Sequence, residues 1–141
     1  MLKYVMHRYL SFIPFLFISP ALADGLSVPA DVISVYDGDT FKAQAYPWPG
    51  MTMAVSIRVN GIDTPEIRGK CDAEKQAAIV ARDYVRDVLG ESVILKNVKR
   101  GKYAGRVVAD VYLTDGRSLT ELLIASGLGR PYDGGKRSGW C

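Results

Sequence analysis

Apolar and polar residues alternate along five short stretches of the chain, and a period of two is typical of β-strands that are buried on one face. In the third stretch, Met53, Val55, Ile57 and Val59 are expected to face a core, while Arg58 lies among the residues that face away. Pairs that favour turns, such as Asp-Gly and Asn-Gly, separate the stretches. The pattern therefore predicts strands over residues 32–36, 40–46, 53–59, 92–98 and 106–113.

Two further segments have the spacing of amphipathic helices. Over residues 72–89, Asp72 is suited to cap a helix and Gly90 to end it. The apolar face of this helix is predicted to consist of Ala77, Ala81, Tyr84, Val85 and Val88. A shorter helix is predicted over residues 119–126, followed by a tail rich in glycine and polar residues.

The order of these elements is three strands, a helix, two strands and a helix. No helix connects the first three strands, which excludes a parallel doubly wound sheet. Five short strands with one-sided alternation favour a small antiparallel barrel that is strongly bent or closed. We therefore predict an α+β fold, mainly β, namely a five-stranded OB-fold barrel with two or three helices.

Residues 1–23 have the pattern of a secretory leader. A basic start with Lys3 and Arg8 precedes an apolar run, and the small-x-small sequence Ala21-Leu22-Ala23 resembles a cleavage site. Cleavage after Ala23 would leave one domain, residues 24–141, in the periplasm or outside the cell and without stable membrane association. An uncleaved N-terminal anchor is the alternative.

Removal of the leader changes the chemistry that is open to the chain, because His7 is the only histidine. Without it, Ser-His-Asp and Cys-His catalysis and histidine-ligated zinc are excluded. Any metal is expected to be a hard cation held by oxygen atoms. The leader holds two of the 18 basic residues and none of the 15 acidic ones, so the mature net charge is only +1. Net charge is thus weak support for binding to nucleic acid.

The mature chain has two cysteines, Cys71 and Cys141. In an oxidising compartment these can form a disulfide, and we predict that they do. The alternative is two free thiols.

Two acidic clusters lie where predicted strands end, at Asp37-Gly38-Asp39 and at Asp63-Thr64-Pro65-Glu66. Ordinary turn chemistry is the alternative interpretation of each cluster. Arg106 lies on the polar side of a predicted strand, where Asp110 is available as a salt-bridge partner. Basic residues run from position 96 to 106 with Tyr103 among them, which is consistent with a phosphate-facing hairpin or with a solubilising loop.

Taken together and in this order, four segments resemble the staphylococcal nuclease family. They are Tyr36-Asp37-Gly38-Asp39-Thr40, Ile57-Arg58, Gly61-Ile62-Asp63-Thr64-Pro65-Glu66 and Lys102-Tyr103-Ala104-Gly105-Arg106. The resemblance implies an OB-fold barrel. It also implies an endonuclease that hydrolyses DNA and RNA phosphodiester bonds with Ca²⁺ and leaves a 3′-phosphate.

The same resemblance implies a set of site residues. Asp39, Asp63 and the backbone carbonyl of Thr64 match the calcium ligands, and Asp37 matches an acid close to the metal. Glu66 matches the proposed general base, and Arg58 and Arg106 match the arginines that bind the phosphate. The residues expected to bind substrate are Lys102, Tyr103 and Tyr132.

Two other functions remain open at this point. A catalytically inactive OB-fold module that binds nucleic acid would need the basic hairpin and aromatic residues, but it would have no need for Asp39, Asp63 and Glu66 together. A secreted calcium-binding structural domain would explain the acids but not Arg58 and Arg106. For the nuclease we expect DNA and RNA as partners and a monomeric state.

Overall fold

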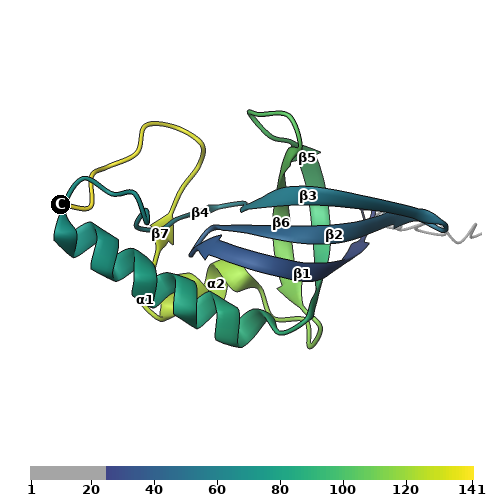
Figure 1. Ribbon diagram of the computed structural model, residues 1–141, viewed down its shortest axis with the longest axis horizontal. Helices are drawn as coiled ribbons and strands as arrows, with labels where there is room; N and C mark the ends of the chain where they lie inside the picture. Colours follow the sequence, from purple (N-terminus) through teal and green to yellow (C-terminus); the bar gives the residue numbers. More distant parts are fainter. Residues whose placement is uncertain (1–24) are drawn as a thin grey trace, which may run out of the picture.

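Five strands close into a barrel in the computed structural model, which describes residues 25–141. Around the barrel lie two helices and a two-stranded sheet (Figure 1). The elements are β1 (Val28–Asp37), β2 (Thr40–Trp48), β3 (Met51–Val59), β4 (Ile62–Asp63), α1 (Asp72–Leu89), β5 (Ser92–Arg100), β6 (Arg106–Leu113), α2 (Leu119–Ala125) and β7 (Arg130–Pro131). The predicted OB-fold class is confirmed, whereas the predicted leader lies outside the described residues.

The strand order around the barrel is β1-β2-β3-β6-β5, and β5 returns to pair with β1. Every pairing is antiparallel except that between β3 and β6, which is parallel. The expectation of a purely antiparallel barrel was therefore wrong at this one contact. Because α1 and β5 intervene between β3 and β6, the chain has the length that a parallel connection requires.

The strands bury alternate side chains inside the barrel, as their period of two predicts. In β2 the buried residues are Phe41, Ala43 and Ala45. The alternation fails in the first half of β3, where Met53 is 49% exposed rather than buried. The core is completed by residues from the helices and β4, including Ile62, Val85, Leu89, Leu119 and Leu123.

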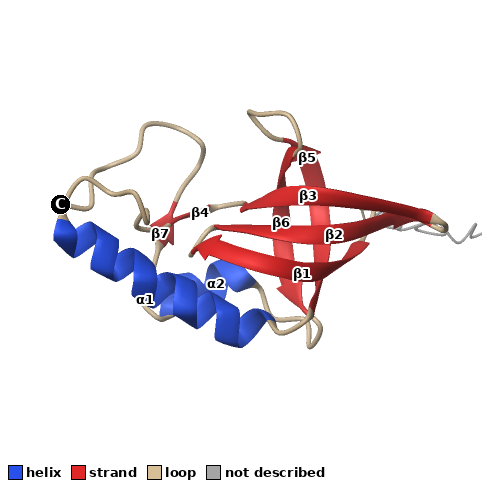
Figure 2. Cartoon of the chain, in the orientation of Figure 1, coloured by secondary structure: helices blue, strands red, loops and turns tan. Residues whose placement is uncertain are grey.

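Helix α1 has the predicted bounds but is rotated slightly from the predicted face. Its N-cap residue is Cys71 rather than Asp72, and the helix buries Ala78 in place of Ala77. Gly90 ends the helix with a φ of 63°, in the region that favours glycine. Figure 2 shows both helices on the same side of the strands.

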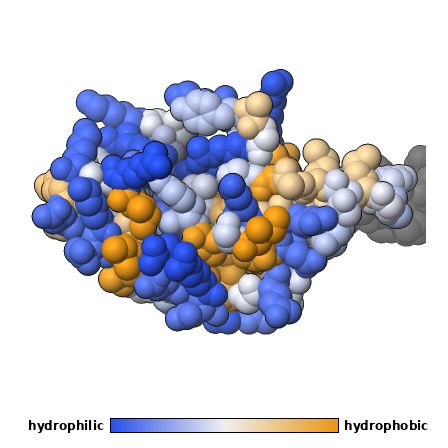
Figure 3. All heavy atoms as spheres, in the orientation of Figure 1, coloured by the Kyte–Doolittle hydropathy of each residue, from blue (hydrophilic) through white to orange (hydrophobic). Residues whose placement is uncertain are grey.

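On the face drawn in Figure 3, hydrophilic side chains surround apolar ones that gather where α1 lies beside β1. Among residues 25–141, no helix is both long enough and apolar enough to cross a membrane.

Candidate active site

The tight turn between β1 and β2 holds the first acidic cluster. Asp37 and Asp39 are 6% and 4% exposed. The backbone N–H of Asp39 donates to Asp37 Oδ1 at 3.2 Å, and the Thr40 hydroxyl donates to Asp39 Oδ1 at 2.9 Å. The turn packs closely against Thr64 and Ala81 because Gly38 has no side chain. A Cβ at Gly38 would lie 2.9 Å from the Thr64 side chain and 3.0 Å from Ala81.

Strand β4 brings the second acidic cluster to this turn. Asp63 is 2% exposed, and Thr64 is fully buried. The backbone N–H of Thr64 donates to Asp39 Oδ2 at 3.1 Å, which joins the two clusters. β4 is held in place by its pairing with β7 near the C-terminus. The period-two pattern did not predict these strands because each has only two residues.

Arg58 lies on the outer face of β3, as the alternation predicts, and this face contributes to the site. Arg58 pairs with Thr40, which also lines the groove. It is 7% exposed, and its Nη1 atom lies 3.2 Å from Asp39 Oδ2. Its other terminal nitrogen, Nη2, is buried without a hydrogen-bond partner. A buried donor without a hydrogen-bond partner costs free energy. An incoming acceptor, such as a phosphate oxygen, would remove that cost by accepting a hydrogen bond from this nitrogen.

Arg106 faces the same site from β6. Its Nη2 atom donates to the Thr40 hydroxyl at 3.4 Å. Asp110, the alternative partner, instead accepts hydrogen bonds from the side chains of Asn60 and Asn97, each at 2.7 Å. The salt-bridge explanation of Arg106 is therefore wrong.

Glu66 follows β4 on an exposed segment whose backbone is hydrogen-bonded to Glu74 of α1. The buried carboxylate of Glu74 accepts hydrogen bonds from the backbone N–H groups of Glu66 at 3.4 Å and Lys70 at 2.8 Å. A Cβ on Gly69 would lie 2.4 Å from Glu74, so glycine leaves room for this contact. Glu74 thus positions the segment that carries Glu66, a role that its place in α1 did not reveal.

One groove collects most of the predicted residues. Asp37, Asp39, Arg58, Glu66 and Arg106 line it. The three residues expected to bind substrate, Lys102, Tyr103 and Tyr132, line it as well. Tyr103 is 60% exposed in the β5–β6 connection, and the Tyr132 ring lies 5.9 Å from the Arg58 guanidinium carbon. Asp63 lines the adjoining pocket, which shares Glu66 and Arg137 with the groove.

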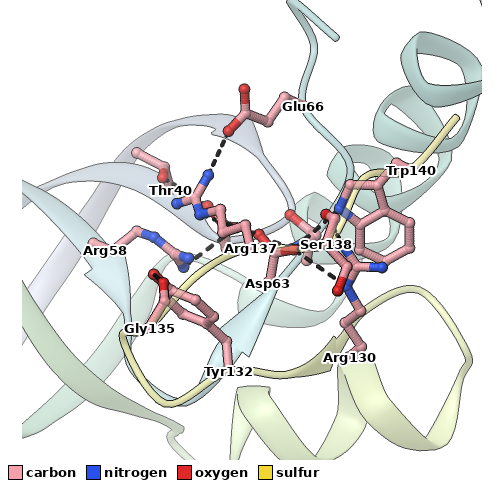
Figure 4. A network of polar contacts seen from close by, with 12 residues as sticks. Thr40, Arg58, Asp63, Glu66, Arg130, Tyr132, Gly135, Arg137, Ser138 and Trp140 are labelled. Carbon is pink, nitrogen blue, oxygen red and sulfur yellow. Dashed lines mark hydrogen bonds and ion pairs between the residues drawn. The ribbon is translucent and has the colours of Figure 1, made fainter. Parts of the chain in front are cut away.

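The C-terminal segment adds Trp140 and two arginines, Arg130 and Arg137, and sequence reasoning found neither arginine (Figure 4). Asp63 Oδ2 accepts hydrogen bonds from Arg130 Nη2 at 3.2 Å and from Trp140 Nε1 at 3.1 Å. Arg137 lies between Asp63 and Glu66. A tail rich in glycine carries no periodic signal, so no local pattern could have placed these side chains in the site.

The tail is anchored at its end by a disulfide between Cys71 and Cys141, the pair that the sequence analysis expects. Cys71 immediately precedes α1, so the bond holds the end of the tail beside the start of this helix (Figure 1). Both cysteines are engaged, and no cysteine among the described residues is free.

The acidic side chains fit a hard divalent cation. Asp37, Asp39 and Asp63 are all buried, and Asp63 Oδ1 has no hydrogen-bond partner. Burial and the neighbouring charge of Asp39 raise the pKa of Asp37 to about 7. Crowded buried carboxylates with an unsatisfied oxygen are the ligand type that Ca²⁺ accepts. The residues that would hold the ion are Asp39, Asp63 and the Thr64 carbonyl, with Asp37 nearby.

The closed five-stranded barrel with this strand order defines an OB-fold domain, and the polar groove is lined by its strands and by the tail. A comparison with protein-family models matches residues 56–138 to the family described as staphylococcal nuclease homologue. The match covers more than half of the chain, so the chain belongs to this family, as its motifs suggested. A comparison with curated proteins finds no match.

Proposed function

We propose that the protein is a calcium-dependent endonuclease that hydrolyses phosphodiester bonds in DNA and RNA. The observation that carries this proposal is the meeting of buried carboxylates and two arginines in one groove. Carboxylates alone would repel a phosphodiester. The arginines and a cation together would neutralise both the acids and the substrate.

The chain's own residues support a division of labour. Arg58 and Arg106 approach the groove from β3 and β6, so their guanidinium groups can bind the non-bridging oxygens on which negative charge grows in a phosphorane-like transition state. Glu66 is 50% exposed, so its carboxylate can accept the proton of an attacking water. Tyr103 and Tyr132 offer rings for bases, and Lys102 offers a charge for a terminal phosphate, consistent with 3′-phosphate products.

When bound, Ca²⁺ would supply charge neutralisation and orient the phosphate. Asp39 and Asp63 would hold it through carboxylate oxygens, and Thr64 through its carbonyl. Two charged ligands with one carbonyl leave several coordination positions to water and substrate. We therefore expect a dissociation constant on the order of 10⁻⁴ to 10⁻³ M, as in other extracellular calcium modules.

Calorimetry without nucleotide measures this affinity. Mg²⁺ demands tighter octahedral geometry and is expected to support much less cleavage. Micromolar calcium binding, or full activity in Mg²⁺ alone, would contradict the prediction.

Incubation of the purified protein with plasmid DNA and with RNA tests the function, first with Ca²⁺ and then with a chelator. A nuclease cleaves only with the ion. Binding that retards the DNA without any cleavage would indicate an inactive OB-fold module. Calcium binding without either effect would indicate a structural calcium-binding domain.

We also propose that the protein is exported to the periplasm or beyond the cell after cleavage behind Ala23. The pattern of residues 1–23 supports this proposal. The mass of the protein recovered from the periplasm and medium tests it, because processing at this bond would leave a chain that begins at Asp24. A monomer in solution is expected and can be tested by light scattering.

A further inference from the structure

Arg137 lies between two acids of the candidate site, although it comes from the C-terminal tail. Its Nη1 atom is 2.5 Å from Glu66 Oε1, and its Nε atom is 3.6 Å from Asp63 Oδ1. The guanidinium therefore bridges the proposed general base and a proposed metal ligand (Figure 4). The side chain of Arg137 is 40% exposed, so it can leave this position without opening the core.

The two oxygens of Asp63 have different surroundings. Oδ2 accepts hydrogen bonds from Arg130 and Trp140, whereas Oδ1 accepts none. Arg137 lies close enough to Oδ1 for electrostatic attraction but too far for a hydrogen bond. The tail thus satisfies one oxygen of Asp63 and leaves the other to a cation.

Two carboxylates attract the guanidinium of Arg137 to this place. It lies against Glu66 and Asp63. A divalent cation at the same carboxylates would remove this attraction and repel the guanidinium.

The acids at the site do not form a tight cluster of three. Among residues 25–141, no three acidic side chains bring their ligand atoms within 4.8 Å of one another. The one cluster this tight is Cys71, Glu74 and Cys141, whose sulfurs are bonded to each other. Arg137 is the cation that contacts both Asp63 and Glu66 in this arrangement.

The tail holds Arg137 near the site from both sides. β7 ends at Pro131, where the tail leaves its pairing with β4, and the disulfide anchors the tail at Cys141. Anchoring a short segment at both ends raises the effective concentration of Arg137 at the carboxylates. The disulfide is therefore expected to strengthen the contact.

We propose that Arg137 is a tethered cation that bridges Asp63 and Glu66 and competes with the divalent cation for Asp63. The proposal rests on the proposed function only in that a divalent cation binds at Asp63. Arg137 is thus a positioning residue, which keeps two like charges together until the ion replaces it. The Cys71–Cys141 bond favours Arg137 over the cation, because it limits how far the tail can move away from the carboxylates.

Calcium titration by calorimetry of the exported chain, without nucleotide, tests the proposal. Arg137→Gln is expected to tighten calcium binding about five- to tenfold. Arg137→Lys keeps the charge and is expected to stay closer to wild type. Lys136→Gln is the matched control, because it removes the same charge from the neighbouring exposed residue, which forms no hydrogen bond or ion pair with residues 25–141. For this control we expect a change of less than about twofold, because exposed charges are screened.

Two further measurements extend the test. Without metal, Arg137→Gln is expected to melt at a lower temperature than wild type, and calcium is expected to raise its melting temperature by more. The double variant Cys71→Ser/Cys141→Ser is expected to tighten calcium binding by a smaller factor. When Arg137→Gln is added to this double variant, calcium binding is expected to be no tighter than in Arg137→Gln alone, because both changes weaken the same competitor.

The outcomes separate this proposal from the proposed function. Unchanged or weaker calcium binding in Arg137→Gln, or equal tightening in Lys136→Gln, would overturn the competition. Tighter binding in Arg137→Gln together with no cleavage of any nucleic acid would support the competition and overturn the nuclease. Absence of calcium binding in every variant would overturn both the competition and the calcium dependence.

Discussion

Glu66 is the residue for which the site makes the sharpest mechanistic prediction. Glu66→Gln removes the basic carboxylate but keeps the shape of the side chain. We expect turnover to fall by roughly 10² to 10⁴, while the fold and nucleotide binding are retained. Cleavage rates and binding to a short oligonucleotide, measured on the same preparation, check this. A rate near that of wild type would show that another group takes the proton.

Arg106 and Asp110 lie four residues apart on β6 but make different contacts, so they form a contrasting pair. Arg106→Lys is expected to lower turnover by about 10² or more, because an ammonium cannot reproduce a bidentate guanidinium contact with phosphate. The measurement is the cleavage rate at saturating calcium.

Asp110→Asn is the comparison for this experiment. Asp110 bridges Asn60 and Asn97 near the surface, so its loss is expected to cost about 1 kcal/mol of stability and to leave most of the activity. Equal damage to activity from both substitutions would argue that Arg106 acts structurally.

Among the elements, the β1–β2 turn shows how packing places chemistry. Gly38 lies between the two acids and directly against Thr64 and Ala81. Gly38→Ala would force the turn away from β4 and α1. We expect a loss of stability of about 1 to 3 kcal/mol, together with weaker calcium binding.

Gly139→Ala is the control for this substitution, because a Cβ at Gly139 would meet no atom within 4 Å. Chemical denaturation and calcium titration of the two variants provide the comparison. If Gly38→Ala keeps wild-type stability and calcium affinity, the close approach of the turn to Thr64 is not required.

At the level of the domain, the Cys71–Cys141 bond closes a loop with a sequence separation of 70. Chain entropy assigns to such a loop about 4 kcal/mol, a large share of the stability of a small domain. Reductant is therefore expected to lower the melting temperature by roughly 10 to 20 °C.

The double variant Cys71→Ser/Cys141→Ser is expected to melt at this lower temperature, and reductant is expected to leave its melting temperature unchanged. Mass spectrometry of unreduced protein produced in an oxidising compartment should find no thiol that can be alkylated. Two reactive thiols, or a melting temperature that reductant leaves unchanged, would contradict the prediction.

Residue patterns along the chain were enough to predict the barrel, the bounds of α1 and β6, and the membership of the family. Alternation in β2 and β6 reports one-sided burial, which each strand carries within its own eight or nine residues. The motifs around Asp39, Asp63 and Arg106 are equally local, because a turn or a strand end presents each of them. Neighbouring residues determine these features, so the order of residues is sufficient to predict them.

Contacts between distant segments determined the rest. Three features depend on residues that lie far apart along the chain. They are the burial of Arg58 against Asp39, the true partners of Asp110 and the pairing of β4 with β7. Arg130, Arg137 and Trp140 reach Asp63 from 67 to 77 positions away, in a tail without periodicity. A side chain's local spacing carries no record of such a neighbour. Closure of the barrel and anchoring of the tail bring these residues to the acids, and only folding in three dimensions creates that proximity.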